Sequence, residues 1–227
     1  MCGRYSLYSY KTTPEDFEEI YGFPMTAVVD FPPTYNIGPY RDVPIILSDR
    51  QNQPYMRLAH WQLVPSFAKE FKSKYAMFNT RDDSFDQKPF WRKLLQHSRC
   101  IFPANNFFEW AKVGGQKMPY KFERSDGKLL NIGGIFSIWR DEQQRDIFSA
   151  SMITVDANPV VGEVHGRMPL ILPEQDVRSW LDINRTDAAE LRAAIRTFPG
   201  DRMTAAAVSQ SVNNIKNDSP EMIEPLD

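Results

Sequence analysis

Apolar residues recur every three or four positions in four segments of the chain, the spacing that gathers them on one face of a helix. The first segment opens with Thr13 as N-cap, Pro14 at the first helical position and acidic residues in the first turn, and Gly22 ends it. The other segments are shorter or carry fewer such signals. The predicted helices cover residues 13–22, 89–97, 174–181 and 188–198.

Short runs rich in β-branched and aromatic residues, separated by turn residues, predict strands through most of the remaining chain. These runs do not alternate regularly with helices, which argues against a doubly wound parallel sheet. We therefore expect an α+β fold, a single domain over residues 1–227, with a curled, largely antiparallel, barrel-like β-sheet and a few peripheral helices. The predicted strands cover residues 43–48, 55–61, 99–103, 107–112, 120–124, 131–137, 147–155, 169–172 and 203–208.

The composition is typical of a soluble globular protein, with 42% hydrophobic and 25% charged residues among 227. It excludes a disordered chain, a collagen-like chain and a coiled coil. No apolar run reaches the roughly 18–20 residues of a membrane span, and the N-terminus lacks the pattern of a signal peptide. Since Cys2 and Cys100 are the only cysteines, we expect no disulfide framework and a cytoplasmic protein.

Charge and motif content exclude several classes of site. The net charge of −2 does not indicate a long electrostatic footprint for nucleic acid. His60, His97 and His165 are widely spaced, and neither an H-x-x-x-H nor a C-x-x-C pattern occurs. The glycine-rich loop that cradles phosphates in nucleotide-binding proteins is also missing. We therefore expect no metal and no nucleotide cofactor.

Cys2 becomes the N-terminal residue if Met1 is removed, and a small second residue favours that removal. It then carries an α-amine and a thiol on adjacent carbons, with ordinary pKa values of about 7.7–8.0 and about 8.5. The thiol can attack an amide carbonyl with the amine as base. Alternatively, the amine condenses with an aldehyde to an imine, which the thiol closes to a thiazolidine. Taken alone, Cys2 fits an incidental terminal residue better than either chemistry.

Glu109 and His165 are candidates for proton transfer. Strand alternation places Phe107, Glu109 and Ala111 on one face, among aromatic neighbours. Apolar surroundings disfavour an ionised carboxylate, as a general acid requires, although an outward-facing Glu on a strand edge fits equally well. His165 lies between a turn and an apolar strand, and an imidazole suits proton transfer at physiological pH.

Asn79 and Arg81 alternate onto one face if their segment is extended. An amide and a guanidinium side by side can hold a sugar hydroxyl and a phosphate. The alternative is a surface loop in which Arg81 pairs with Asp83. The sequence of this segment does not decide between them.

In combination, these segments resemble the SOS-response-associated peptidase (SRAP) family, the abasic-site-processing proteins. The resemblance extends from Met1 to about Glu224. M-C-G-R at the N-terminus, F-F-E-W ending at Trp110 and H-G-R-M-P from His165 carry it most specifically. Further matching motifs are Y-N-I-G-P at 35–39, W-Q-L-V-P-S-F at 61–67, N-T-R at 79–81 and V-N-N-I-K-N-D at 212–218.

The resemblance implies binding of single-stranded DNA at an abasic site, where the opened deoxyribose presents an aldehyde. Cys2 would form a thiazolidine with it, a covalent cross-link that shields the lesion. Glu109 would act as general acid and base, His165 would assist proton transfer on the opened sugar, and Asn79 would hydrogen-bond the amine or the sugar. The residues implied as DNA contacts are Arg4, Asn36, Pro39, Phe67, Arg81 and Arg167.

The family pattern also leaves alternatives open. An imine intermediate would permit strand-cleaving lyase activity. A cysteine peptidase or amidohydrolase, and a non-catalytic DNA-binding module, are the competing functions; we expect a monomer without a membrane or metal partner. The sequence departs from the pattern at Gly166, where the family usually has Asp, at Phe67, where Trp is usual, and at Asp83, where Glu is common.

Overall fold

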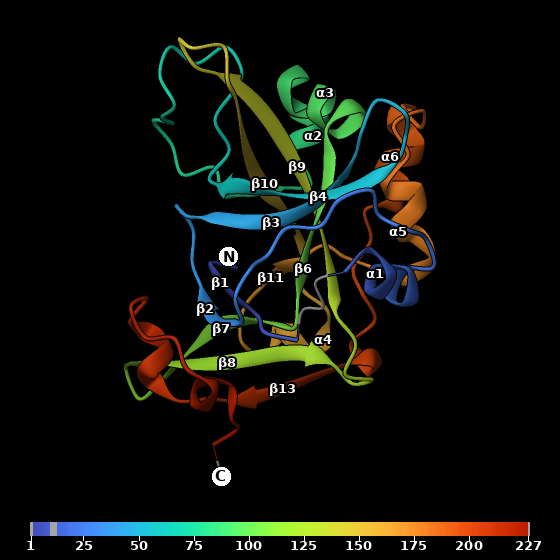
Figure 1. Ribbon diagram of the computed structural model, residues 1–227. Helices are drawn as coiled ribbons and strands as arrows, with labels where there is room; N and C mark the ends of the chain where they lie inside the picture. Colours follow the sequence, from blue (N-terminus) through green and yellow to red (C-terminus); the bar gives the residue numbers. More distant parts are fainter. Residues whose placement is uncertain (1, 10–12, 227) are drawn as a thin grey trace.

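Five strands close into a barrel in the computed structural model, which describes residues 2–9 and 13–226. β10 pairs with both β4 and β9, and the path between those two strands runs through β3 and β6, so the ends of the sheet meet. The barrel occupies the upper part of Figure 1. Its strands are β3 (Asp42–Ser48), β4 (Pro54–Trp61), β6 (Arg99–Ala104), β9 (Leu130–Arg140) and β10 (Asp146–Asp156).

A five-stranded antiparallel sheet lies below the barrel in Figure 1, with the strand order β13, β8, β7, β1, β2. Only Asn105 separates the barrel strand β6 from β7, so the chain passes directly from one sheet to the other. The two sheets consequently share one hydrophobic core. The strands of this sheet are β1 (Arg4–Leu7), β2 (Thr34–Ile37), β7 (Asn106–Val113), β8 (Gln116–Arg124) and β13 (Met203–Ala207).

The second half of β10 carries a short strand on each edge. β5 (Asn79–Arg81) runs parallel to β10, and β11 (Arg167–Pro169) runs antiparallel to it. Met152 donates its N–H toward β5, whereas the carbonyl of the next residue, Ile153, accepts from the side of β11. Neighbouring residues of a strand bond in opposite directions, so β10 brings segments from residues 79–81 and 167–169 to its two edges. β12 (Ile171–Leu172) pairs with β9.

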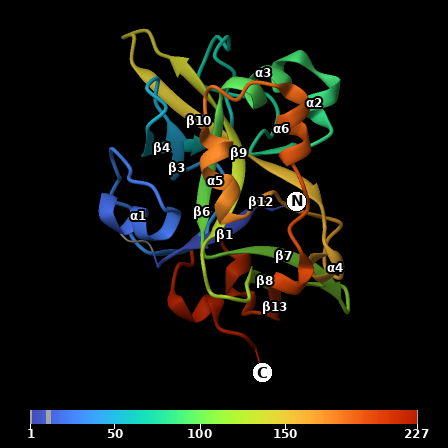
Figure 2. The ribbon, with the colours of Figure 1, turned by 90° about the vertical axis from the view of Figure 1, so that its right-hand side faces the viewer.

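Helices cover the outside of the barrel. α5 and α6 lie along one side in Figure 1, and Figure 2, turned toward that side, shows α5 in front of β6. Within the described ranges, no helix is long and apolar enough to cross a membrane. The helices are α1 (Pro14–Tyr21), α2 (Ser84–Gln87), α3 (Pro89–His97), α4 (Pro159–Gly162), α5 (Glu174–Leu181) and α6 (Ala188–Ala194), with short 3-10 turns at Gly200–Arg202, Gln210–Asn213 and Pro220–Ile223.

Aromatic packing joins β1 to the barrel. The fully buried rings of Tyr5 and Trp61 meet edge to face, with centroids 5.3 Å apart. Barrel closure also depends on Gly134 in β9. A Cβ there would lie 2.9 Å from the carbonyl oxygen of Ser151 in β10 and closer still to the ring of Phe102, so no larger residue fits where these strands meet.

The α+β class and the curled, largely antiparallel, barrel-like sheet are confirmed. Each predicted strand overlaps an observed one, and the helices over 89–97 and 174–181 are found at those residues. The helix predicted over 188–198 is wrong at its end: α6 stops at Ala194 because Ile195 is extended, and Phe198 turns into the core. The strand predicted over 169–172 divides at Leu170 into β11 and β12, which pair with different strands.

Candidate functional site

Cys2 lies just before β1, against β7. Arg4 is opposite Phe108 in these antiparallel strands, so the residues preceding Arg4 run beside Glu109. The Cys2 side chain is fully buried, and its Sγ donates to the Arg4 carbonyl at 3.6 Å. Burial, and then the neighbouring Glu109 carboxylate, raise the pKa of this thiol. It therefore needs a base to become a nucleophile at neutral pH. Met1 lies outside the described residues.

β5 brings Asn79 to the backbone of Cys2. The Asn79 Nδ2 donates to the Cys2 carbonyl oxygen at 2.6 Å, across 77 positions of sequence. This segment is extended, which was the first of the two alternatives that the sequence left open. An amide donor thus lies within one hydrogen bond of the residue whose chemistry is in question.

Glu109 is buried on β7, with 3% of its surface exposed. Of the two locations that the sequence allowed, the buried one is observed. Its neighbour Phe107 stacks on Phe122 in the main core, with ring centroids 5.2 Å apart. Burial raises the pKa of Glu109, and the nearby imidazole of His165 acts in the opposite direction. A carboxyl with a raised pKa holds its proton closer to neutrality and can both donate and accept it.

The loop between α4 and β11 positions His165. Its backbone N–H donates to the Val161 carbonyl at 2.9 Å, which fixes the loop on the short helix. The ring Nδ1 lies 4.0 Å from the Glu109 Oε1 and accepts the Arg167 backbone N–H at 3.0 Å. The same Nδ1 also lies 3.1 Å from the Arg167 carbonyl oxygen, so the Arg167 backbone orients the ring in either tautomer.

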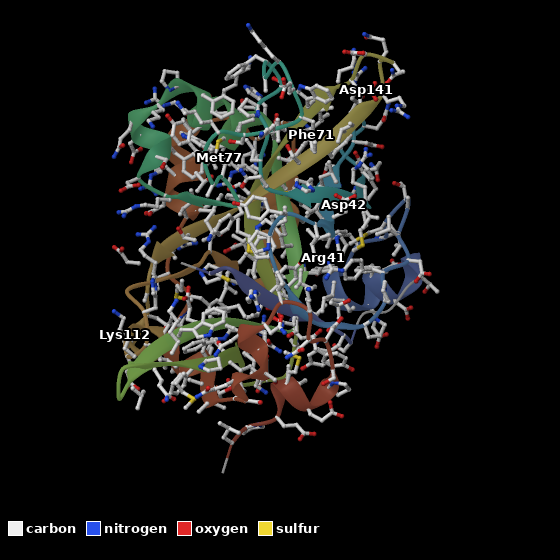
Figure 3. All side chains as sticks on the ribbon, turned by 90° about the vertical axis from the view of Figure 1, so that its left-hand side faces the viewer. Arg41, Asp42, Phe71, Met77, Lys112 and Asp141 are labelled. Carbon is white, nitrogen blue, oxygen red and sulfur yellow. The ribbon has the colours of Figure 1, made fainter. Side chains whose placement is uncertain are left out.

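Cys2, Asn79, Glu109 and His165 therefore converge from four segments of the chain. Together they supply a thiol, an amide donor, a carboxyl group with a raised pKa and an imidazole beside it. Such a set can move protons among water, a carbonyl oxygen and sulfur. Figure 3 labels two residues near these strands. Met77, which comes just before β5, lies in the upper half of the view, and Lys112, near the end of β7, lies in the lower half.

Two of the arginines predicted to contact DNA are paired with carboxylates. The Arg81 Nη2 lies 2.9 Å from Asp83, and both side chains are exposed. The Arg167 guanidinium is mostly buried and lies between Asp82, at 2.5 Å, and Asp156, at 2.6 Å. Each of these positive charges is therefore partly neutralised by its own neighbours.

The remaining predicted contacts differ in exposure. Phe67 is 75% exposed, and its ring meets that of Phe90 edge to face at 5.5 Å. Asn36 is only 1% exposed, and its side chain is fully engaged inside the protein. Pro39 lines a groove beside β1. Of these three side chains, Phe67 offers the largest free apolar surface for stacking.

The groove beside β1 has a volume of about 630 Å³. Sequence reasoning missed most of its residues, because its wall is assembled from the chain before β3, from β7 and β8 and from the C-terminal segment. Tyr40 is 60% exposed and has a φ of 66°, a left-handed backbone that is uncommon for an aromatic residue. The lining residues are Gly3, Arg4, Pro39, Tyr40, Trp110, Lys117, Asn213 and Ile215.

No group of three or more His, Cys, Asp or Glu side chains among the described residues could hold a metal ion. The two described cysteines are free and buried.

Comparison with known proteins assigns the family. The family model described as SOS response associated peptidase (SRAP) matches residues 1–215. The chain belongs to the SRAP family. The abasic site processing protein YoqW of Bacillus subtilis (strain 168) is 32% identical over 226 residues, which cover 99% of both chains. The abasic site processing protein HMCES of Gallus gallus is 31% identical, over 86% of this SRAP chain and 67% of its own length.

Solved structures share the fold of this SRAP protein. A crystal structure of a protein from Bacteroides thetaiotaomicron superposes with a TM-score of 0.84, at 22% identity, over 99% of this chain and 100% of the other. A protein from Bordetella bronchiseptica gives a TM-score of 0.76 at 24% identity, over 92% of this chain and 100% of the other. At these identities the likeness concerns the fold.

Proposed function

We propose that this SRAP protein processes abasic sites in single-stranded DNA by forming a covalent thiazolidine cross-link through Cys2 after removal of Met1. The observation that carries the proposal is the buried Cys2 thiol among Asn79, Glu109 and His165. Relatives that match nearly the whole chain are named abasic site processing proteins, which supports the same substrate. The reaction belongs in the cytoplasm, on DNA, and we propose that the protein acts as a monomer.

The proposed reaction joins an aldehyde and an aminothiol and releases one water. The Cys2 amine adds to the aldehyde carbon of the opened sugar, giving a carbinolamine. Glu109 protonates the carbinolamine hydroxyl, which leaves as water and yields a protonated imine. The ionised Glu109 then takes the thiol proton, and sulfur attacks the imine carbon to close the ring while the nitrogen keeps one proton.

The other two side chains have separate roles in this scheme. Asn79 holds the Cys2 carbonyl at 2.6 Å and so keeps the Cys2 backbone, which carries the amine, in place beside β5. His165 assists proton transfer on the sugar hydroxyl. An imine that is not trapped by sulfur would permit β-elimination, which is the lyase activity that we include in the proposal.

The experiment mixes untagged protein with an oligonucleotide that carries one abasic site and separates the products on a denaturing gel. We expect a heat-stable shifted band from the unmodified protein. Cys2→Ala, and a protein whose N-terminus is blocked by an uncleaved extension, should give none. Cys100→Ala is the matched control, because this second buried thiol lies on the barrel strand β6, and it should retain the band.

Absence of the band, with mass spectrometry confirming a free Cys2 N-terminus, would overturn the proposed cross-link. Turnover of peptide substrates by the same preparation would then favour the peptidase alternative. Binding of abasic DNA that survives Cys2→Ala, without any covalent product, would favour a non-catalytic binding module.

A further inference from the structure

The segment Val212–Asp218, which we call the C-terminal strap, crosses the edge of the five-stranded sheet beside Arg4. A single buried side chain holds most of it. The two protons of the Asn36 Nδ2 are shared among three strap carbonyls, those of Val212 at 3.3 Å, Asn214 at 3.0 Å and Asn217 at 3.0 Å. The far end of the strap is fixed separately, because the Tyr35 N–H donates to Asp218 at 2.5 Å.

The same Asn36 side chain also holds Arg4. Its Oδ1 accepts from the Arg4 Nη1 at 2.8 Å, and the strap carbonyls of Val212 and Asn213 accept from the guanidinium at 2.5 Å and 3.5 Å. Among the described residues, all these acceptors are neutral. When a guanidinium bonds only to neutral oxygens, no neighbouring negative charge offsets its positive charge. A guanidinium paired with carboxylates is offset in this way.

Arg4 thus differs from Arg81 and Arg167, whose guanidiniums lie against aspartates. Its guanidinium carbon also lies 6.0 Å from the ring centroid of Trp110, within the groove beside β1. Fixed, desolvated on one side and not neutralised, Arg4 has the properties of an anion contact.

The strap approaches the end of β2 closely at Gly38, where a larger residue requires the Ile215 side chain to move. A Cβ on Gly38 would overlap the side chain of Ile215 and come within 3.3 Å of the Arg4 Nε. Strap, Arg4 and the end of β2 are therefore in direct contact, through the hydrogen bonds of Arg4 and the packing of Ile215 against Gly38.

We propose that Asn36 is a positioning residue which, through the C-terminal strap, fixes the uncompensated charge of Arg4 for a DNA phosphate. The inference rests on the proposed function and replaces the expected contact between Asn36 and DNA, since only 1% of that side chain is exposed. Asn36 suits the task because its amide presents an acceptor to Arg4 and donors to the strap. An aspartate there would neutralise Arg4 and repel the strap carbonyls.

The test is the salt dependence of reversible binding to single-stranded DNA without an abasic site. Each phosphate contact on a single strand contributes about 0.7 to the slope of log affinity against log salt. Arg4→Met should reduce the slope by about 0.7, and Asn36→Asp should reduce it equally. The double variant should lose no more than either single variant, because both remove one contact. Asn184→Asp, an exposed change of the same charge, is the control.

Gly38→Ala gives a second route if Asn36→Asp does not fold, because it displaces Ile215 and Arg4 without changing any charge. It should also lower the slope by about 0.7. A folded Asn36→Asp protein that keeps the slope of the unmodified protein, or losses that add in the double variant, would overturn the inference while leaving the cross-link intact. An unmodified protein that neither binds DNA nor forms the cross-link overturns both proposals.

Discussion

The backbone N–H of Arg167 donates to the ring Nδ1 of His165 at 3.0 Å. The imidazole is therefore oriented by the chain two residues ahead of it and not by a side chain at position 166, which is Gly. Arg167 is in turn held by Asp82, next to the strand that carries Asn79. The Arg167–Asp82 ion pair connects the segments on the two edges of β10. It therefore helps to hold His165 and Asn79 in fixed positions relative to each other.

We predict that Gly166→Asp, which restores the residue usual in the family, folds normally. Apart from its two chain neighbours, a Cβ at this position meets no atom within 4 Å, and the backbone is outside the left-handed region. Loss of glycine flexibility should stabilise the protein by about 0.4–1 kcal/mol. The added carboxylate introduces a negative charge next to His165, so the dependence of the cross-linking rate on pH should change.

Gly166→Ala is the control for that variant, because it removes the same flexibility without adding charge. It should match the stability gain in urea unfolding and leave the pH profile unchanged. An equal displacement of the profile in both variants would show that backbone restriction, and not charge, alters His165.

Replacing Glu109 by Gln should stabilise the protein while abolishing the cross-link. The pKa of Glu109 is raised by burial, so the folded state keeps a proton that the unfolded state has already lost. The free energy of unfolding therefore falls as pH rises from the ordinary glutamate value, about 4.3, through the raised one. Gln removes this penalty. Urea unfolding should show Glu109→Gln more stable at pH 8, with the advantage vanishing near pH 4.

The exposed Glu142→Gln is the control for this pH dependence. It should follow the unmodified protein across the whole range. If Glu109→Gln is more stable by the same amount at every pH, the gain comes from packing and not from the charge. That result would contradict the view that the buried carboxylate is kept for its chemistry although it lowers stability.

Local signals account for the parts of the fold that the sequence predicted. α1 begins at a capping box formed by Thr13 and Asp16 and ends at Gly22, whose φ is 71°. Each of these devices operates within a few residues. β1, β2 and β5 went unpredicted because strands of three or four residues owe their existence to partners elsewhere in the chain.

The candidate site was found from residue types, but its geometry depends on contacts between distant segments. Asn79 meets Cys2 across 77 positions, and no local pattern encodes that contact. The same limit explains Asn36: its motif marks a residue of the family pattern, while its hydrogen-bond partners lie at residues 212–217. Only the fold distinguishes a buried clamp from a surface contact.

Asp83→Asn should increase affinity for single-stranded DNA. Asp83 pairs with the exposed Arg81, and removing its charge frees that guanidinium for a phosphate. We expect about a two- to fivefold gain at low salt that shrinks as screening increases. Asp146→Asn is the matched control, because it breaks a similarly exposed pair with Arg140 at the β9–β10 hairpin. Equal gains in both variants would reflect net charge alone.

We expect substitution of Arg99 to lower the free energy of unfolding strongly, because this side chain caps the C-terminal ends of two helices. Its guanidinium donates to the Leu95 and Gln96 carbonyls at the end of α3, and to the Trp180 and Asp182 carbonyls at the end of α5. Burial lowers its pKa to about 10, so it stays charged at neutral pH against the negative ends of both helix dipoles.

Arg99→Met would remove the guanidinium from all four carbonyls, although the Asp182 carbonyl keeps the Arg185 N–H at 3.2 Å, and should cost about 3 kcal/mol in urea unfolding. Arg99→Lys keeps the charge but cannot reach all four oxygens from one nitrogen, so its cost should be intermediate. Lys93→Met, on the exposed face of the same helix, should stay within about 0.5 kcal/mol of the unmodified protein. If Lys at position 99 were as stable as Arg, charge alone would hold the helix ends, and the forked geometry of the guanidinium would be dispensable.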